Sequence, residues 1–210
     1  MRKLLKKRLK NQKGFVSILV TILAIIGVVF VAYLLDSNTQ SFVIREIEGI
    51  MDTSAMNTFN RTLSIEKLKD EVFGFDTGGE IKPTDSDGTY TLPSVTQEFI
   101  KKTYRDELNN QASTNSLILE LKADTINLEF GKSSWGGGDS TKSRPYLVID
   151  SFVTIKMKHS SAFDYSASYQ NRQFASYKSG VTDVTIENLG TPQDGEMVMV
   201  VRCTSRLYHR

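Results

Sequence analysis

The chain has 210 residues with one cysteine and two histidines, so an intrachain disulfide and a cysteine-based zinc site are both excluded. The net charge is only +2, but the first 35 residues carry seven Lys and Arg and no acidic residue. Of the 26 basic residues, 19 therefore remain in the rest of the chain with all 24 acidic residues, which gives that part a net charge of −5. This acidic excess disfavours nucleic-acid binding. We expect the lone Cys203 to be a buried strand residue, with an intermolecular disulfide as the alternative.

An uncharged apolar run follows the basic amino-terminal segment. It extends from Phe15 to Leu35 and would form a helix about 31 Å long, close to the ~30 Å thickness of the hydrocarbon layer of a bilayer. A cleavable secretory signal has a shorter apolar core that ends in small residues, whereas this run ends in "VAYLLDSN". The pattern predicts a retained single-pass helix at residues 15–35. Residues 1–14 would be a cytoplasmic tail in contact with anionic lipid head groups, and the C-terminal domain would be extracellular.

Apolar residues then recur every four positions, which predicts that the helix continues as a stalk over residues 36–63. No proline occurs between residues 15 and 82, and the lone Gly49 costs a helix only about 1 kcal/mol. Two interpretations of the apolar face remain open: it packs on the chain's own folded domain, or it packs against neighbouring copies. The candidate helix-packing residues are Val43, Ile47, Ile50, Met51, Ala55 and Phe59, with Leu63 continuing the series.

Residues 64–210 are expected to form one extracytoplasmic α+β domain. A short helix is predicted from Ile65 to about residue 73, and a second from Ser94, which forms a capping box with Gln97, to about residue 110. Between them lies a turn-rich loop, residues 74–93. The loop contains "DSDG", which lacks the spacing of an EF-hand and is predicted to be a solvated turn.

The second half of the domain has the period-two alternation of strands. Residues 117–121 and 126–130 alternate in different phases, so a bulge or tight turn is expected near Asp124. Residues 197–201, "MVMVV", are apolar at every position and predict a central strand covered on both faces. Together these segments indicate an antiparallel sheet of about five or six strands. The further strands are predicted at residues 146–158, 163–169, 181–187 and 196–208.

No motif for catalysis, cofactor binding or metal binding is present. His159 and His209 are isolated, without the neighbouring ligands that a metal site needs. The segment "GKSSWGGGDSTKSRP" lacks the residue order of a phosphate-binding loop and is predicted to be a hairpin loop. We therefore expect a protein that is not an enzyme and has no cofactor.

The amino-terminal half resembles the type IV pilin superfamily. The features that carry this resemblance are the basic leader, the junction Lys13-Gly14 before Phe15, the apolar stretch, the helical stalk and the β-rich domain. The segments "MDTSAMNTFNRTLS" and "EFIKKTYRDELNN" are similar to those of Tad-type (tight adherence) pseudopilins of Gram-positive bacteria. The resemblance implies cleavage by a prepilin peptidase between Gly14 and Phe15, and packing of the apolar stems into a fibre core. Leu19 stands where most pilins carry a glutamate, which is a feature of some minor subunits.

Two functions are consistent with this organisation. The first is a pilin-like structural subunit of a surface pilus or secretion apparatus, with other pilin-like subunits as partners. The second is a bitopic scaffold of a secretion or conjugation machine, whose anchored domain binds another membrane component. A third hypothesis, binding of glycans or host surfaces, rests on the aromatic strand that contains Tyr165 and Tyr169.

Overall fold

The structure is a computed structural model of the chain and describes residues 2–70, 72–134, 143–158, 176–179, 182–189 and 196–208. It combines helices with an antiparallel sheet, which is compatible with the predicted α+β class. The described residues fall into two compact units, one made of residues 2–44 and the other beginning at residue 45. We refer to the second unit as the head.

The first helix, α1, extends over Arg2–Thr62, and its residues 45–62 belong to the head. Two threonines there satisfy their hydroxyl groups within the helix: Thr58 Oγ1 donates to the Ser54 carbonyl oxygen at 2.7 Å, and Thr62 Oγ1 donates to the Thr58 carbonyl oxygen at 2.8 Å. Side chains of this segment are buried in the head. The second part of the predicted stalk is thus a core helix of the head rather than a free stalk.

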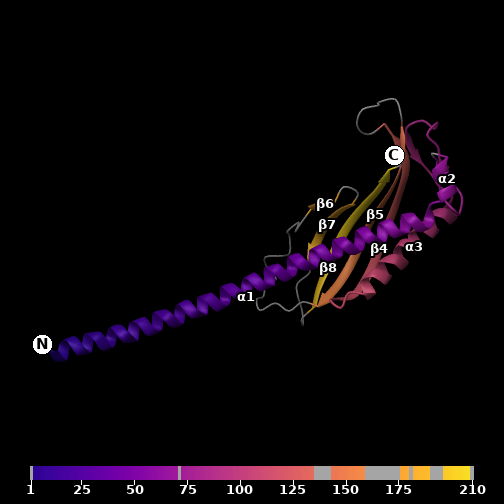
Figure 1. The fold of residues 1–210 in the computed structure, drawn as a ribbon. Helices are drawn as coiled ribbons and strands as arrows, with labels where there is room; N and C mark the ends of the chain where they lie inside the picture. The colour runs from indigo at the N-terminus through magenta and orange to yellow at the C-terminus, as the bar shows by residue number, and fades with distance from the viewer. Residues whose placement is uncertain are drawn as a thin grey trace. The chain divides into compact units, whose positions relative to one another are not determined.

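The head contains a six-stranded antiparallel sheet with the order β3-β4-β5-β8-β7-β6 (Figure 1). A two-stranded sheet, β1 (Phe73–Gly74) with β2 (Glu80–Ile81), precedes it in the sequence. The strands of the larger sheet are β3 (Gly88–Tyr90), β4 (Ile118–Ser133), β5 (Arg144–Lys158), β6 (Ser176–Ser179), β7 (Thr182–Leu189) and β8 (Glu196–Tyr208).

Alternation along β5 gives the sheet two different faces. Leu147, Ile149 and Val153 are fully buried on the inner face, whereas Val148 and Asp150 on the outer face are half-buried. This is the period of two that a strand imposes on its side chains. The inner face is therefore the core side of the sheet.

Two helices cover the inner face: residues 45–62 of α1, and α3 (Ser94–Ser113) (Figure 1). Tyr104 of α3 is completely buried where they meet the sheet. Its hydroxyl group lies 2.9 Å from Ser151 Oγ of β5 and donates to Met51 Sδ of α1 at 3.7 Å. The head is thus a two-layer domain, with one helical layer on one side of the sheet.

The strand predictions hold best in β4, β5 and β8. The two predicted strand segments, 117–121 and 126–130, lie in a single strand, β4, from residue 118 on, and its register shifts between Ala123 and Thr125, so the irregularity predicted near Asp124 is a β-bulge. The strand predicted at residues 196–208 has the bounds of β8, and that predicted at residues 181–187 corresponds to β7. The strand predicted at residues 163–169, including Tyr165 and Tyr169, lies outside the described residues.

Three local predictions differ from the structure. The short helix α2 (Ile65–Lys69) ends earlier than expected. The capping box is wrong: Pro93 occupies the N-cap of α3, Ser94 makes no capping bond, and Gln97 Nε2 donates to the Leu92 carbonyl oxygen at 2.8 Å. Strand β8 is central as predicted, but its cover on both faces is not found, because the outer-face side chain of Val198 is 40% exposed.

Candidate membrane span and outer-face groove

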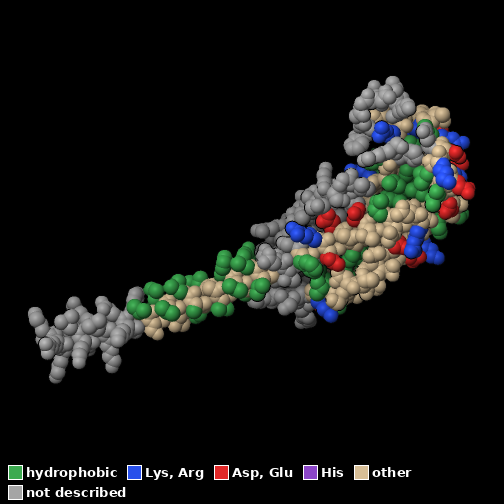
Figure 2. Space-filling model, in the orientation of Figure 1, with side chains coloured by type: hydrophobic (Ala, Val, Ile, Leu, Met, Phe, Trp, Pro, Cys, Tyr) green, Lys and Arg blue, Asp and Glu red, His purple; other side chains and the backbone are tan. Residues whose placement is uncertain are grey.

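Residues Val16–Leu35 of α1 form the one helix in the described part of the chain that is long and apolar enough to cross a membrane. None of these 20 residues is buried by the rest of the protein, and hydrophobic side chains lie along the surface of the segment (Figure 2). Val28, for example, is 69% exposed. Full burial of each such aliphatic side chain is worth about 1.5 kcal/mol or more, so the segment presents an apolar surface that no described part of the chain covers.

The one threonine of the span has a hydrogen-bond partner within the helix itself. Thr21 Oγ1 donates to the Ser17 carbonyl oxygen at 2.9 Å, one helical turn earlier. A hydroxyl group in lipid must find a partner, because no water is available there. The threonine is therefore compatible with a helix surrounded by hydrocarbon.

The predicted helix-packing residues lie in the core of the head. Ile47, Ile50, Met51, Ala55 and Phe59 are each at most 7% exposed. The side chain of Val43 lies outside the described set. The sequence left open whether this face packs on the chain's own domain or against neighbouring copies. In the structure these five side chains pack on the chain's own domain. Gly14 and Phe15, the candidate cleavage site, both lie within the helical backbone of α1, and the Phe15 side chain is outside the described set.

A buried carboxylate joins α1 to α3. Glu107 of α3 is 2% exposed and accepts a hydrogen bond from Asn57 Nδ2 at 3.0 Å. Its other oxygen lies 2.5 Å from Arg61 Nη1, whose side chain is 65% exposed. A buried carboxylate is costly unless hydrogen-bonded groups compensate it, so this arrangement specifies how α1 docks on α3.

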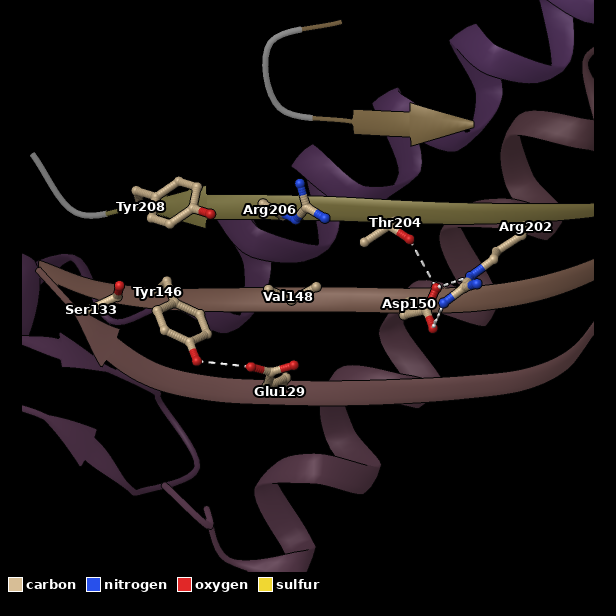
Figure 3. A pocket seen from close by; sticks show the side chains of 9 residues that line it. All are labelled: Glu129, Ser133, Tyr146, Val148, Asp150, Arg202, Thr204, Arg206 and Tyr208. Atoms are coloured by element: carbon tan, nitrogen blue, oxygen red, sulfur yellow. Dashed lines mark hydrogen bonds and ion pairs between the residues drawn. The ribbon is translucent and has the colours of Figure 1, made fainter. Parts of the chain in front are cut away.

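A groove of about 420 Å³ opens on the outer face of the sheet, opposite the helices (Figure 3). We call it the outer-face groove. Its residues come from three adjacent strands, which hold them at fixed positions of the register. They are Glu129 and Ser133 of β4, Tyr146, Val148 and Asp150 of β5, and Arg202, Thr204, Arg206 and Tyr208 of β8.

One end of the groove is formed by a hydrogen-bonded charge pair. Asp150 accepts two bonds from the Arg202 guanidinium group, from Nε at 3.0 Å and from Nη2 at 3.2 Å, and a third from Thr204 Oγ1 at 2.9 Å. Bidentate pairing of this kind fixes the orientation of both groups. Arg202 also lies over the ring of Phe152, 5.3 Å from its centroid.

The other end of the groove is aromatic. The rings of Tyr146 and Tyr208 lie 6.2 Å apart at an angle of 51°, and the Tyr146 hydroxyl group donates to Glu129 Oε1 at 2.8 Å. Partial burial raises the pKa of Tyr146, as does the adjacent Glu129 carboxylate. Gly131 pairs with Tyr146, and a Cβ atom at residue 131 would overlap the Tyr146 phenol group. The absence of a side chain at Gly131 therefore allows the Tyr146 ring to pack directly over the backbone of β4.

Other reactive groups are engaged in the fold. Cys203 is completely buried, and burial raises the pKa of its thiol to about 12, so it is a buried strand residue as predicted. Among the described residues no group of three or more His, Cys, Asp and Glu is arranged for a metal ion. His159 and His209 lie outside the described residues.

The "DSDG" segment and the residues just before it contact the side chain of a lysine from a distant strand. Lys132 of β4 is only 2% exposed, and its Nζ donates to the carbonyl oxygens of Pro83 and Asp85. The Asp85 side chain accepts a bond from the Lys82 backbone N–H at 2.8 Å, which closes the turn. The segment is a turn, as the sequence predicts, but it is held by a lysine from a distant strand.

Comparisons of the chain with family models, with curated proteins and with solved structures find no match. Two features of the described residues stand out for function. One is an apolar helical segment that no other described residue covers, and the other is a polar and aromatic groove built on three paired strands.

Proposed function

We propose that the protein is a membrane-anchored, pilin-like structural subunit that assembles through its N-terminal helix. The observation that carries this proposal is the division of α1. Residues 16–35 are apolar and uncovered, whereas residues 47–59 of the same helix are built into the core of the head. A subunit of this kind needs an apolar stem free for lipid or for other stems, and a head that folds without its neighbours.

The division also limits which residues can pack between subunits. Phe59 and Met51 are at most 1% exposed within the head, so a neighbouring copy has no access to them. The stem–stem contacts of the proposed assembly therefore lie before the core segment of α1, and residues 16–35 supply the longest apolar surface for them. Before assembly these residues would be covered by lipid, and afterwards by the apolar residues of adjacent stems.

The orientation follows from charge. Seven Lys and Arg lie within the first 13 residues, before the span, and this segment has no acidic residue. Positively charged residues beside a span remain on the cytoplasmic side. The proposed topology accordingly has the N-terminus in the cytoplasm and the head outside the cell.

A second function, that of a bitopic scaffold, is favoured by two observations at the N-terminus. Leu19 stands where the resemblance leads one to expect a glutamate. The helix also continues without interruption through Gly14 and Phe15, so its backbone groups are engaged in helical hydrogen bonds that a peptidase would have to open. In this case the same anchor would simply tether the head near a partner, and the leader would be retained.

Two measurements on membranes distinguish these functions. The first is mass spectrometry of the purified protein, where a new terminus at Phe15 supports the pilin-like subunit and an intact Met1 supports the scaffold. The second is cross-linking by bismaleimide of a Val28→Cys, Cys203→Ser variant. We expect a ladder of oligomers larger than dimers, and the matched head variant Asn60→Cys, Cys203→Ser should give no such ladder. An intact Met1 together with the absence of the ladder would refute assembly through the stem.

A further inference from the structure

We propose that the outer-face groove binds a neutral carbohydrate chain. This inference concerns the head alone and does not depend on how the N-terminal helix is used. It goes beyond a structural subunit, because it gives the exposed side of the sheet a ligand of its own. The charges, the aromatic rings and the rigidity of the groove each contribute to the assignment.

The charge of the groove excludes a strongly ionic ligand. Glu129 and Asp150 supply two carboxylates, and Arg202 and Arg206 supply two guanidinium groups. A phosphate or sulfate group would approach the two carboxylates, and a cationic ligand would approach the two guanidinium groups. Since attraction and repulsion are balanced, the groove gives no electrostatic steering of either sign.

The same groups match a ligand rich in hydroxyl groups. A sugar hydroxyl can donate to a carboxylate and accept from a guanidinium group, so each sugar ring can use both kinds of partner. The two kinds lie near one another in the groove, where Asp150 contacts Arg202 at 3.0 Å. Thr204 and Ser133 add hydroxyl groups that can both donate and accept.

The aromatic end supplies the apolar contacts. Sugar rings have C–H faces, which pack on aromatic side chains through dispersion and weak hydrogen bonds. Tyr146 and Tyr208 stand side by side at 6.2 Å, and Val148 forms an aliphatic floor next to them (Figure 3). A volume of about 420 Å³ is within the usual range for small-ligand sites.

The groove is organised before any ligand arrives. Its side chains project from three paired strands, and hydrogen bonds fix Asp150 at one end and Tyr146 at the other. Groups held in place in this way lose little conformational freedom on binding. A protein partner fits less well, because protein–protein interfaces are depleted of Glu and Asp, although they are enriched in Tyr and Arg. The groove contains Glu129 and Asp150, and Val148 is the single aliphatic residue among those that line it.

The test uses the full-length protein in detergent micelles and isothermal titration calorimetry. The neutral probes are chitotetraose, cellotetraose and mannotetraose, and the anionic probe is heparin tetrasaccharide. We expect saturable binding of at least one neutral probe with a Kd below about 1 mM, and little or no binding of the anionic probe. Tyr208→Ala and Arg206→Ala should each weaken the binding at least tenfold, as measured by Kd.

Two further variants control for folding. Tyr146→Phe keeps the ring and removes the hydroxyl bond to Glu129, so a several-fold loss is expected without loss of the fold. Lys122→Ala changes an exposed residue of β4 that does not line the groove, and it should leave the Kd unchanged. Failure of all neutral probes, exclusive binding of heparin tetrasaccharide, equal binding by Tyr208→Ala, or dimerisation of heads that Tyr208→Ala abolishes would each overturn the proposal.

Discussion

Removal of the N-terminal helix should separate anchoring from folding. A chain that begins at Ser37 lacks the apolar span but keeps the part of α1 that is buried in the head. A chain that begins at Ser64 lacks both parts. We expect the first chain to be water-soluble and folded, and the second to be unfolded.

The magnitude follows from three side chains that residues 45–62 contribute to the core. Ile47, Met51 and Phe59 are 2%, 0% and 1% exposed. Burial of each is worth about 1.5–3 kcal/mol, or roughly 5–9 kcal/mol together. Small domains have a total stability of about 5–15 kcal/mol. Loss of this helix therefore removes a free energy comparable to the whole stability of the head.

The assay is urea denaturation followed by far-UV circular dichroism, with ¹H–¹⁵N spectra of each chain to report the folded state. Within the chain that begins at Ser37, Phe59→Ala should reduce the free energy of unfolding by about 3–5 kcal/mol. The adjacent exposed Asn60→Ala should change it by less than about 0.5 kcal/mol. A dispersed spectrum and a cooperative transition from the chain that begins at Ser64 would show that α1 is not part of the core.

Four further expectations concern buried polar groups, and each is measured by urea unfolding. Ser54 Oγ is buried without a hydrogen-bond partner among the described residues, so Ser54→Ala should stabilise the head by up to about 1 kcal/mol. Glu107→Ala should destabilise it by about 1–3 kcal/mol, because Asn57 loses its hydrogen-bond acceptor. The loss of the ion pair adds little, because the Arg61 side chain is exposed and the pair is screened by solvent. Lys132→Met should cost about 1–3 kcal/mol and speed amide hydrogen exchange in residues 82–88, because two carbonyl oxygens lose their donor. The pKa of Cys203 rises from 9.0 to about 12 on folding, so the folded state keeps a proton that the unfolded state releases. Stability should fall as the pH rises above about 9, and Cys203→Ala should remove that part of the slope.

The sequence predicts the elements in which periodicity is long. Strands β5 and β8 have 15 and 13 residues, which is long enough for their existence to follow from the pattern. The predicted bounds of β8 are the observed ones, although its residues 197–201 are apolar at every position, and β5 begins at Arg144, two residues before the predicted start. The bulge near Asp124 follows from a change of phase, which no regular strand can accommodate. Strands β1, β2 and β3 have only two or three residues each, which is too short for a period to appear.

The outer-face groove could not be found from the sequence. Asp150 and Arg202 are 52 residues apart and meet only because β8 pairs with β5 rather than with β4. Alternation indicates that each residue lies on one face of its strand, but it does not indicate which strands are neighbours. Gly131 lies in the segment "GKSSWGGGDSTKSRP", yet its packing role depends on the position of Tyr146, which only the register defines.

The two parts of α1 show why the apolar face of residues 43–63 left two interpretations open. A period of four specifies which side chains share a face of the helix, but it does not specify what covers them. In residues 47–61 the contacts of Asn57 and Arg61 with Glu107, and of Met51 with Tyr104, identify the cover as the head itself. In residues 16–35 no described side chain of the protein supplies such a contact surface. Substitutions in the first segment should therefore act on folding, whereas substitutions in the second should act on insertion into lipid and on contacts between stems.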